Sequence, residues 1–381
     1  MILQDLKGKI STLKKVLFFI YKNYTIVAVF RDFLFLCSTA AEIYGITVFG
    51  KFIDATTQVL VEWKAFSLRH YLATDSFKYL ALILLLWIVT QVCNQVRAYL
   101  YTVIYEKTWS TTQSNMIGKV AQSNLQDVEK KEFQDMLAFI PAFSIDRLIS
   151  VYDNFSIVLS SFVRLVSAMV IVFGYVGPSA FLLLLFVFPE TIFIHLRRKE
   201  VRGYLDESIG KLRYLNYIHG TALTISNFLE LRVNNIYSYL RRRYDEEYGE
   251  YLSGYFKTLD SFYRTRIGYS ILGQILKFGY VIFAFAIAIV KRLTFGTFKA
   301  LYDYIDISYT SASSIVDSLS LISVNLGYIA KYFDLIEYEG FGDQYHGKVK
   351  LPKGTPVLEF KNLTFSYPDD TKTVVLKDLN M

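Results

Sequence analysis

Acidic and basic residues stand inside the long apolar segments of this sequence, where they could hold a charged molecule or pair with one another. Glu42, Glu190 and Asp306 each lie about ten residues from the predicted outer end of their segment, which is roughly 15 Å deep in a hydrocarbon core about 30 Å thick. Arg164 and Lys277 lie slightly deeper. Charges at that depth usually face a bundle interior or a water-filled cavity. Two interpretations are open: a cavity for a cationic or zwitterionic substrate, or pairing inside the bundle, for example of Glu42 or Glu190 with Arg164 or Lys277.

The last apolar segment also carries a polar stripe. Its members recur every third or fourth residue, so they share one face of a helix. They are Asp306, Thr310, Ser313, Asp317 and Ser320. In lipid a polar face must turn inward. We expect the stripe to line a polar path across the membrane, and the alternative is serine-rich packing between helices.

The composition is that of a membrane protein with large parts in water. Hydrophobic residues make up 53% of the 381 residues and aromatic residues 17%, while charged residues still account for 20%. The mean hydropathy is +0.31. The net charge is +7, and the basic residues lie next to apolar segments. We therefore expect membrane lipids, rather than nucleic acid, to be their partner.

Cysteines and histidines predict neither a metal site nor a catalytic site. Cys37 and Cys93 both lie inside apolar runs, which is typical of buried small hydrophobic residues. The four histidines are scattered, and no serine, histidine and aspartate arrangement typical of a nucleophilic site stands out. The chemistry of this chain is expected to lie in its membrane segments.

Six segments approach the roughly 20 apolar residues that a membrane-spanning helix needs. They are 26–52, 79–105, 155–175, 180–196, 267–290 and 299–335. The first and the last are weaker because they hold several charges. The predicted fold class is an all-α membrane protein with six long transmembrane helices. Residues 10–23 predict a short amphipathic helix on the membrane surface, within an N-terminal region 1–25.

The basic residues predict the orientation. They concentrate between 197 and 266, whereas the turns at 174–179 and 293–297 contain none. Because cytoplasmic loops carry the excess of lysine and arginine, 197–266 and both termini are predicted to be cytoplasmic and 53–77 external. The inner connections are long, polar and helix-patterned. About twenty extra residues on each helix would reach roughly 30 Å beyond the membrane.

The sequence changes character after the last apolar segment. Proline and glycine at 351–356 end the helical pattern, and apolar and polar residues then alternate over 357–368, which is the period of a β-strand. We expect a membrane domain at 26–336, a linker at 337–356 and the beginning of a β-rich soluble domain at 357–381.

Several motifs occur in the order found in one family of membrane proteins. They are Asp-Val-Glu-Lys-Lys-Glu-Phe-Gln-Asp-Met-Leu at 127–137, Glu-Leu-Arg at 230–232, Leu-Thr-Phe-Gly-Thr-Phe at 293–298, Leu-Glu-Phe-Lys-Asn-Leu-Thr-Phe-Ser-Tyr-Pro at 358–368 and Val-Leu-Lys-Asp-Leu-Asn at 375–380. With these motifs the chain resembles the exporter type of ATP-binding cassette (ABC) transporter along essentially its whole length. The second inner connection is most similar in composition to bacterial exporters of peptides, such as bacteriocins and lantibiotics.

The resemblance implies a half-transporter with six spans, two short coupling helices on its intracellular side and a C-terminal nucleotide-binding domain. Such a subunit pairs with a second half-transporter, and an identical chain is expected here. It would lie in the plasma membrane, use ATP and Mg²⁺, and export a peptide, lipid or amphipathic drug by alternating access.

The resemblance also implies roles for particular residues. Tyr367 would stack its ring on the adenine of ATP; the alternative is an ordinary exposed tyrosine at a strand end before a turn. The coupling helices would seat apolar side chains in a groove of the nucleotide-binding domain, and the alternative is plain packing of amphipathic helices. The candidate side chains are Phe133, Met136 and Leu137 in the first coupling helix and Phe228, Leu229 and Leu231 in the second.

The sequence departs from the family in one respect: it contains no G-x-x-x-x-G-K-[ST] phosphate-binding loop. We therefore expect a fragment of a longer half-transporter that cannot hydrolyse ATP by itself, with ATP and Mg²⁺ held mainly by the missing part. Two other functions are open. One is a lipid flippase or an importer with the exporter fold. The other is a membrane receptor or assembly protein that transports nothing.

Overall fold

The computed structural model is mostly helical and describes residues 2–62, 68–123, 125–128, 133, 134, 136, 137, 140, 144–338, 359–366 and 374–381. The helices are α1 (Ile2–Glu62), α2 (Leu68–Tyr71), α3 (Asp75–Gln122), α4 (Leu125–Val128), α6 (Ile145–Val176), η1 (Gly177–Phe181), α7 (Leu182–Glu207), α8 (Ile209–Leu223), η2 (Ile225–Asn227), α9 (Phe228–Val233), α10 (Tyr237–Val290) and α11 (Phe295–Ile336). Two strands follow, β1 (Leu363–Ser366) and β2 (Val374–Leu379). The predicted helical fold with strands near its C-terminal end is confirmed.

The prediction of six membrane helices was wrong in number. Within the described residues, four helical segments are long and apolar enough to cross a membrane: Asp75–Gln122, Ile145–Phe186, Tyr237–Val290 and Phe295–Ile336. The predicted segment 26–52 lies in α1 and holds Arg31, Asp32 and Glu42, whose charges are costly in lipid. The predicted segment 180–196 is divided, because its first residues complete the apolar stretch that ends at Phe186.

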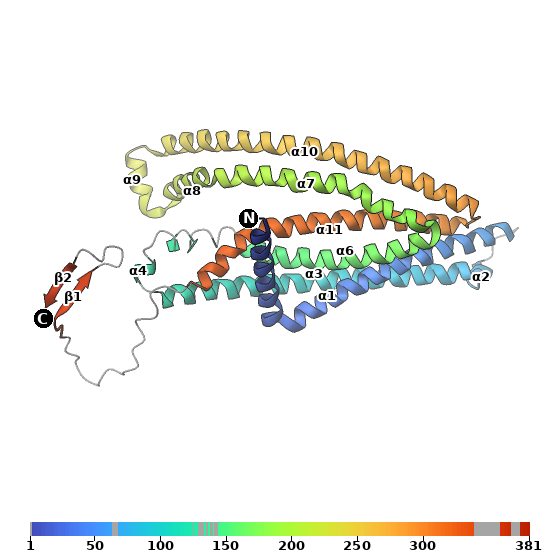
Figure 1. Ribbon diagram of the computed structural model, residues 1–381, viewed down its shortest axis with the longest axis horizontal. Coiled ribbons are helices and arrows are strands. Elements are labelled where there is room, and N and C mark those ends of the chain that lie inside the picture. Colours follow the sequence, from blue (N-terminus) through green and yellow to red (C-terminus); the bar gives the residue numbers. More distant parts are fainter. Residues whose placement is uncertain are drawn as a thin grey trace.

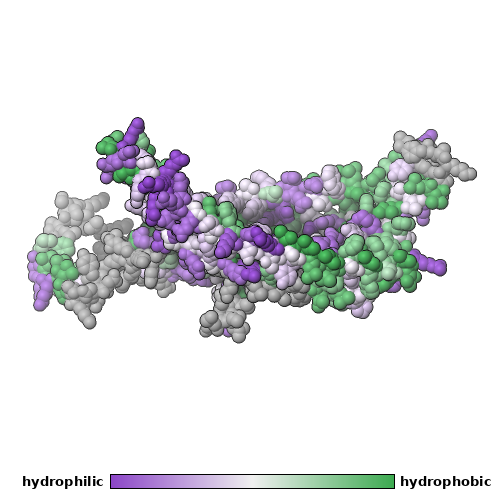
Figure 2. Space-filling view, turned by 90° about the horizontal axis from the view of Figure 1, so that it is seen from above, coloured by the Kyte–Doolittle hydropathy of each residue, from purple (hydrophilic) through white to green (hydrophobic). Residues whose placement is uncertain are grey.

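The long helices lie side by side in two groups (Figure 1). Helices α1, α3, α6 and α11 form one group, in which α6 packs most extensively on α11 and α1 on α3. Helices α7 and α10 pack on each other, and α7 also contacts α11, so α7 joins the groups. Hydrophobic side chains gather over the half of the bundle that holds the α6–α7 and α10–α11 turns, and hydrophilic ones toward the opposite end (Figure 2). The apolar half is the part that suits a bilayer.

Two hydrophobic clusters hold the described helices together. One joins the first part of α1 to α3, α6 and the end of α11, around Tyr152 and Ile329. The other joins α6, α7, α10 and α11 in the apolar half. Alanines at 168, 284 and 300 belong to this second cluster. Small residues of this kind let membrane helices approach closely.

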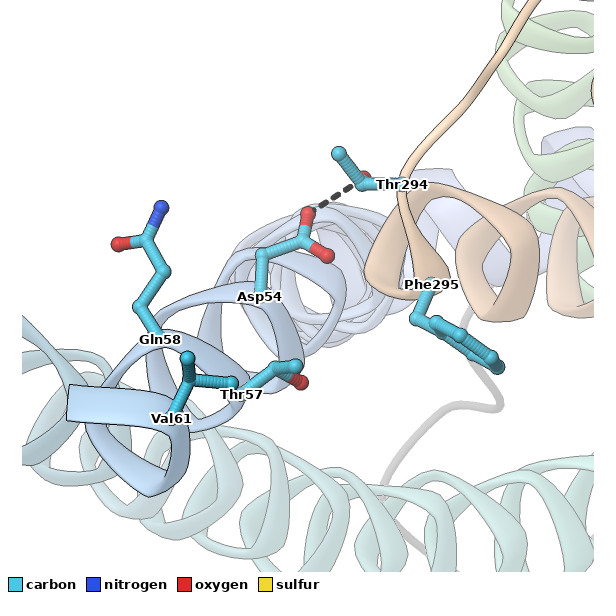
Figure 3. A pocket seen from close by; sticks show the side chains of 6 residues that line it. All are labelled: Asp54, Thr57, Gln58, Val61, Thr294 and Phe295. Atoms are coloured by element: carbon cyan, nitrogen blue, oxygen red, sulfur yellow. Dashed lines mark hydrogen bonds between the residues drawn. The ribbon is translucent and has the colours of Figure 1, made fainter. Parts of the chain in front are cut away.

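Helices α1 and α11 cross closely at two glycines, near the α10–α11 turn. A Cβ atom on Gly296 would lie 1.8 Å from the carbonyl oxygen of Gly50. Asp54, one turn along α1, accepts hydrogen bonds from the backbone N–H of Gly296 at 2.7 Å and from the hydroxyl of Thr294 at 2.6 Å. It thereby caps the start of α11. A pocket of about 310 Å³ lies beside this contact (Figure 3), lined by Asp54, Thr57, Gln58, Val61, Thr294 and Phe295.

Replacing Gly296 with alanine is expected to destabilise the folded chain by about 1–3 kcal/mol, the usual range for overpacking, because the new methyl group would press on the backbone of α1. The thermal unfolding midpoint in detergent measures this effect. Gly279→Ala in α10 is the matched control, since a Cβ atom there meets nothing within 4 Å. The control is expected to be neutral or slightly stabilising. Equal midpoints for the two variants would contradict the close crossing.

The two strands form one antiparallel pair. Leu363 lies opposite Leu379, and Phe365 lies opposite Leu376. Backbone hydrogen bonds between Phe360 and Met381 extend the pairing beyond the strands, at 2.7 and 3.0 Å. The predicted strand period is therefore confirmed within the described part of 357–381, while the proposed division into domains stays a prediction.

Candidate functional site

Two ion pairs join α10 to α11 along the polar face of α11. The Nζ of Lys277 lies 2.8 Å from Oδ1 of Asp306, and Nη2 of Arg266 lies 3.6 Å from Oδ2 of Asp317. The separation between the pairs is the same on both helices, about eleven residues or three helical turns. The two ion pairs therefore lie roughly 16 Å apart along the helix axis. Together they hold the two antiparallel helices in one register.

In the pair nearer the α10–α11 turn, the acid is the accessible partner. The side chain of Asp306 is 43% exposed, whereas that of Lys277 is 14% exposed. The ammonium of Lys277 also lies 5.3 Å from the centre of the Tyr309 ring. Gly273 on α10 makes room for Tyr309, because a Cβ atom there would lie 2.3 Å from the tyrosine hydroxyl. The pair therefore holds its lysine inside the protein and presents a carboxylate outward.

The rest of the predicted stripe is partly accessible and partly packed. Thr310 is exposed, and its hydroxyl donates to the carbonyl oxygen of Asp306 at 2.9 Å. Ser313 is half-buried, and Ser320 is buried. The structure thus brings the stripe together on one face. Its end toward Asp306 suits a polar path, and its end toward Ser320 suits helix packing.

Glu42 forms a third ion pair, between α1 and α6. Its Oε2 lies 2.5 Å from Nη2 of Arg164, and the side chains of Glu42 and Arg164 are 40% and 30% exposed. This is one of the pairings that the sequence left open. Glu190 falls within α7, but its side chain lies outside the described residues. Its role as a cavity residue stays a prediction.

A fourth charged cluster was not predicted as a site. Arg31 is 2% exposed and forms ion pairs with Asp32 and Asp153. Asp32 accepts hydrogen bonds from the hydroxyls of Ser156, at 2.8 Å, and Tyr21. Burial, followed by this hydrogen bond, raises the pKa of Tyr21 well above its usual range. Adjacent opposite charges at 31 and 32 in an apolar stretch were the available indication, because such charges must find partners when buried.

The predicted second coupling segment forms a short helix, α9, at the end of the helical bundle opposite the α10–α11 turn (Figure 1). Leu229 and Phe228 are 74% and 44% exposed, and Val233 is 82% exposed. Leu231 is buried at 7%. Leu229 and Phe228 are therefore available to a partner, whereas Leu231 packs within the chain.

The residues predicted for the first coupling helix lie in the interior. Phe133 is completely buried, and its ring centre lies 5.5 Å from that of Tyr338, just beyond α11. Met136 and Leu137 are partly buried against the same cluster. These contacts correspond to the packing alternative, and a coupling role for this segment stays a prediction.

Comparison of the sequence with models of protein families found no match, and comparison with curated proteins found none either. The resemblance to ABC exporters therefore rests on the sequence motifs. Tyr367, the predicted adenine contact, lies outside the described residues. Among the residues that are described, no group of three or more histidine, cysteine, aspartate or glutamate side chains could hold a metal ion.

Proposed function

We propose that this chain is the membrane-embedded part of an ATP-driven exporter of the ABC type. In this proposal the polar face of α11 lines the path of a cationic or zwitterionic substrate. The end of the bundle that carries α9 lies in the cytoplasm, where a nucleotide-binding domain begins at residue 357. A second half-transporter, expected to be identical, completes the path.

The length of the helices supports this proposal, because the helices can cross the membrane and also extend far into the cytoplasm. Helix α10 has 54 residues, α3 has 48 and α11 has 42. At 1.5 Å per residue, α10 is about 80 Å long, so roughly 50 Å of it extends beyond a 30 Å hydrocarbon core. Helices of this length can carry a movement at their aqueous end into the membrane.

Ion pairs stiffen the aqueous part. Lys211 of α8 lies 2.6 Å from Glu250 of α10 and 3.5 Å from Glu247, and Arg243 lies 2.8 Å from Glu247. The hydrogen bond to Glu250 raises the pKa of Lys211. Because α8 is tied in this way to α10, a push on the intervening α9 is transmitted to α10.

The exposed apolar surface of α9 is the observation that carries the proposal. Leu229 and Val233 project from a six-residue helix with 74% and 82% of their surfaces exposed. A group of exposed apolar side chains on one short helix at the end of the bundle suits a contact with another protein surface. In an exporter, that surface is the motor domain, whose closure on ATP would move α9.

We expect the exporter to hydrolyse ATP. Binding and hydrolysis of ATP would supply the free energy that drives the helices between inward-facing and outward-facing arrangements. Tyr367 would contact its adenine. In the proposed whole protein, the groups that hold the phosphates and Mg²⁺ belong to the rest of the nucleotide-binding domain. The residues described above would contribute the substrate path along α11, the long helices that transmit movement, and the contact surface on α9.

The test uses the complete gene product in liposomes. Wild-type protein is expected to hydrolyse ATP faster when a transported substrate is added. Leu229→Asp is expected to leave basal ATP hydrolysis in place and to reduce transport at least tenfold, because a carboxylate cannot seat in an apolar groove. Both rates are measured on the same vesicles.

Phe256→Asp in α10 is the matched control, because Phe256 is also exposed, at 58%, on the extended part of a helix. It is expected to keep transport near the wild-type rate. Absence of ATP hydrolysis in the complete product would overturn the proposed function. Equal transport by wild type and Leu229→Asp would overturn the role of α9.

A further inference from the structure

The first part of α1, residues 7–23, is an arm set apart from the rest of the helix. The backbone at Tyr24 is not helical, with φ −133° and ψ 36°. The Tyr24 hydroxyl donates to the carbonyl oxygen of Lys107 at 2.9 Å and lies 2.7 Å from Oγ1 of Thr111, which fixes the kink to α3. The arm crosses the bundle at a steep angle, near the place where the hydrophilic half of the bundle meets the hydrophobic half (Figures 1 and 2).

One face of the arm is packed against the protein. Val16 and Ile20 are completely buried, in the cluster that includes the end of α11. The ring centre of Phe19 lies 6.5 Å from that of Tyr332, edge to face. The arm is therefore held in place by apolar contacts, and its other face has a fixed orientation.

The other face carries exposed lysines around an exposed aromatic ring. Lys7, Lys14 and Lys22 are exposed and follow one another at about two helical turns, or roughly 10–12 Å. Phe18 stands between the last two with 66% of its surface exposed, and Lys22 lies 5.4 Å from its ring centre. From residue 6 to residue 30 the chain has five lysines and no acidic residue. This face is both cationic and apolar.

We propose that this face binds the headgroups of anionic phospholipids. A helix in the plane of a membrane surface places its apolar side chains among the upper acyl chains and its lysines among the phosphates. The arm crosses the bundle near the beginning of its hydrophobic half, so in a membrane the arm would lie near the headgroups and Phe18 would be covered by lipid. An acidic protein would match the lysines, but the position of the arm near the hydrophobic half of the bundle favours lipid.

Lipid bound to the arm would also stabilise the C-terminal end of α11, which the arm contacts. Lys15 of the arm forms an ion pair with Glu337, at 2.6 Å, and lies 5.8 Å from the ring centre of Phe333. Glu337 caps the C-terminal end of α11. A ligand that holds the arm therefore stabilises the segment from which the chain continues to the strands. This inference does not depend on the proposed transport function.

The experiment measures the thermal unfolding midpoint of the purified chain in neutral detergent with increasing phosphatidylglycerol or phosphatidylcholine. A ligand that binds only the folded state raises the midpoint, and the rise grows with the logarithm of the ligand concentration relative to its Kd. Phosphatidylglycerol is expected to raise the wild-type midpoint and phosphatidylcholine to leave it unchanged. The triple variant Lys7→Gln, Lys14→Gln, Lys22→Gln is expected to need roughly a hundredfold more phosphatidylglycerol for the same rise.

Two further variants make the result specific. Arg241→Gln, Arg242→Gln, Lys257→Gln removes the same charge from exposed positions on α10 and is expected to respond like wild type. Lys7→Arg, Lys14→Arg, Lys22→Arg keeps the charge and is expected to retain the response. An equal loss in the α10 variant would overturn the site, as would an equal rise with phosphatidylcholine. Binding of polyglutamate by wild type, without any response to phosphatidylglycerol, would replace lipid by an acidic protein partner.

Discussion

Replacing Arg31 with methionine is expected to lower the stability of the folded chain by about 3–5 kcal/mol, the range found when one partner of a buried ion pair is removed. Arg31 is 2% exposed, and it neutralises the carboxylates of both Asp32 and Asp153. Its guanidinium also lies 4.9 Å from the Tyr152 ring centre. Without it, two acids remain close together between α1 and α6. The midpoint of chemical unfolding in detergent measures the loss.

Two comparisons separate the buried cluster from a general effect of charge. Lys78→Met breaks an ion pair whose side chains are 70% and 72% exposed, and it is expected to leave the stability nearly unchanged because water screens the pair. Arg31→Met combined with Asp153→Leu is expected to recover part of the loss, because one uncompensated carboxylate is removed. If Arg31→Met unfolds at the same denaturant concentration as Lys78→Met, the cluster does not hold α1 to α6.

The helical fold could be predicted because it depends on local composition. Long apolar runs and inner connections with few glycines or prolines predict helices without knowledge of their neighbours. Charge made the count of membrane helices harder, because the cost of Arg31, Asp32 and Glu42 depends on partners elsewhere in the chain. The close crossing of Gly50 and Gly296 was not predicted either. The sequence alone does not show whether a glycine in a helix permits a close helix contact, because that depends on the position of the neighbouring helix.

The sequence could predict which residues share the polar face of α11, but it could not predict which charged residues pair with each other. The spacing of Asp306, Thr310 and Asp317 places them on one helix face whatever the tertiary structure. Which base meets which acid depends on the register of α10 against α11, and that is set by the turn between them and by the cap at Thr294. Sequence reasoning allowed Lys277 to meet Glu42 or Glu190, and the structure places it against Asp306.

Exchanging the charges of Lys277 and Asp306 is expected to separate the two interpretations of the polar face. Asp306→Asn alone leaves a lysine that is 14% exposed without its carboxylate, which is expected to cost about 1–3 kcal/mol of stability. It is also expected to slow export of cationic substrates about tenfold in the complete protein, while neutral substrates keep their rate. The unfolding midpoint and vesicle transport measure these two effects separately.

The double variant Lys277→Asp, Asp306→Lys restores the ion pair, and stability is expected to return to within about 1 kcal/mol of wild type. Transport of cations is not expected to return, because the accessible position on α11 then carries a lysine and the carboxylate lies in the covered position on α10. A pair that serves packing alone would regain both properties on exchange. The pair Lys299 and Asp303, within α11, is the control, since its exchange leaves the α10–α11 contact untouched. Recovery of cation export in the double variant would therefore assign Asp306 to helix packing and remove it from the transport path.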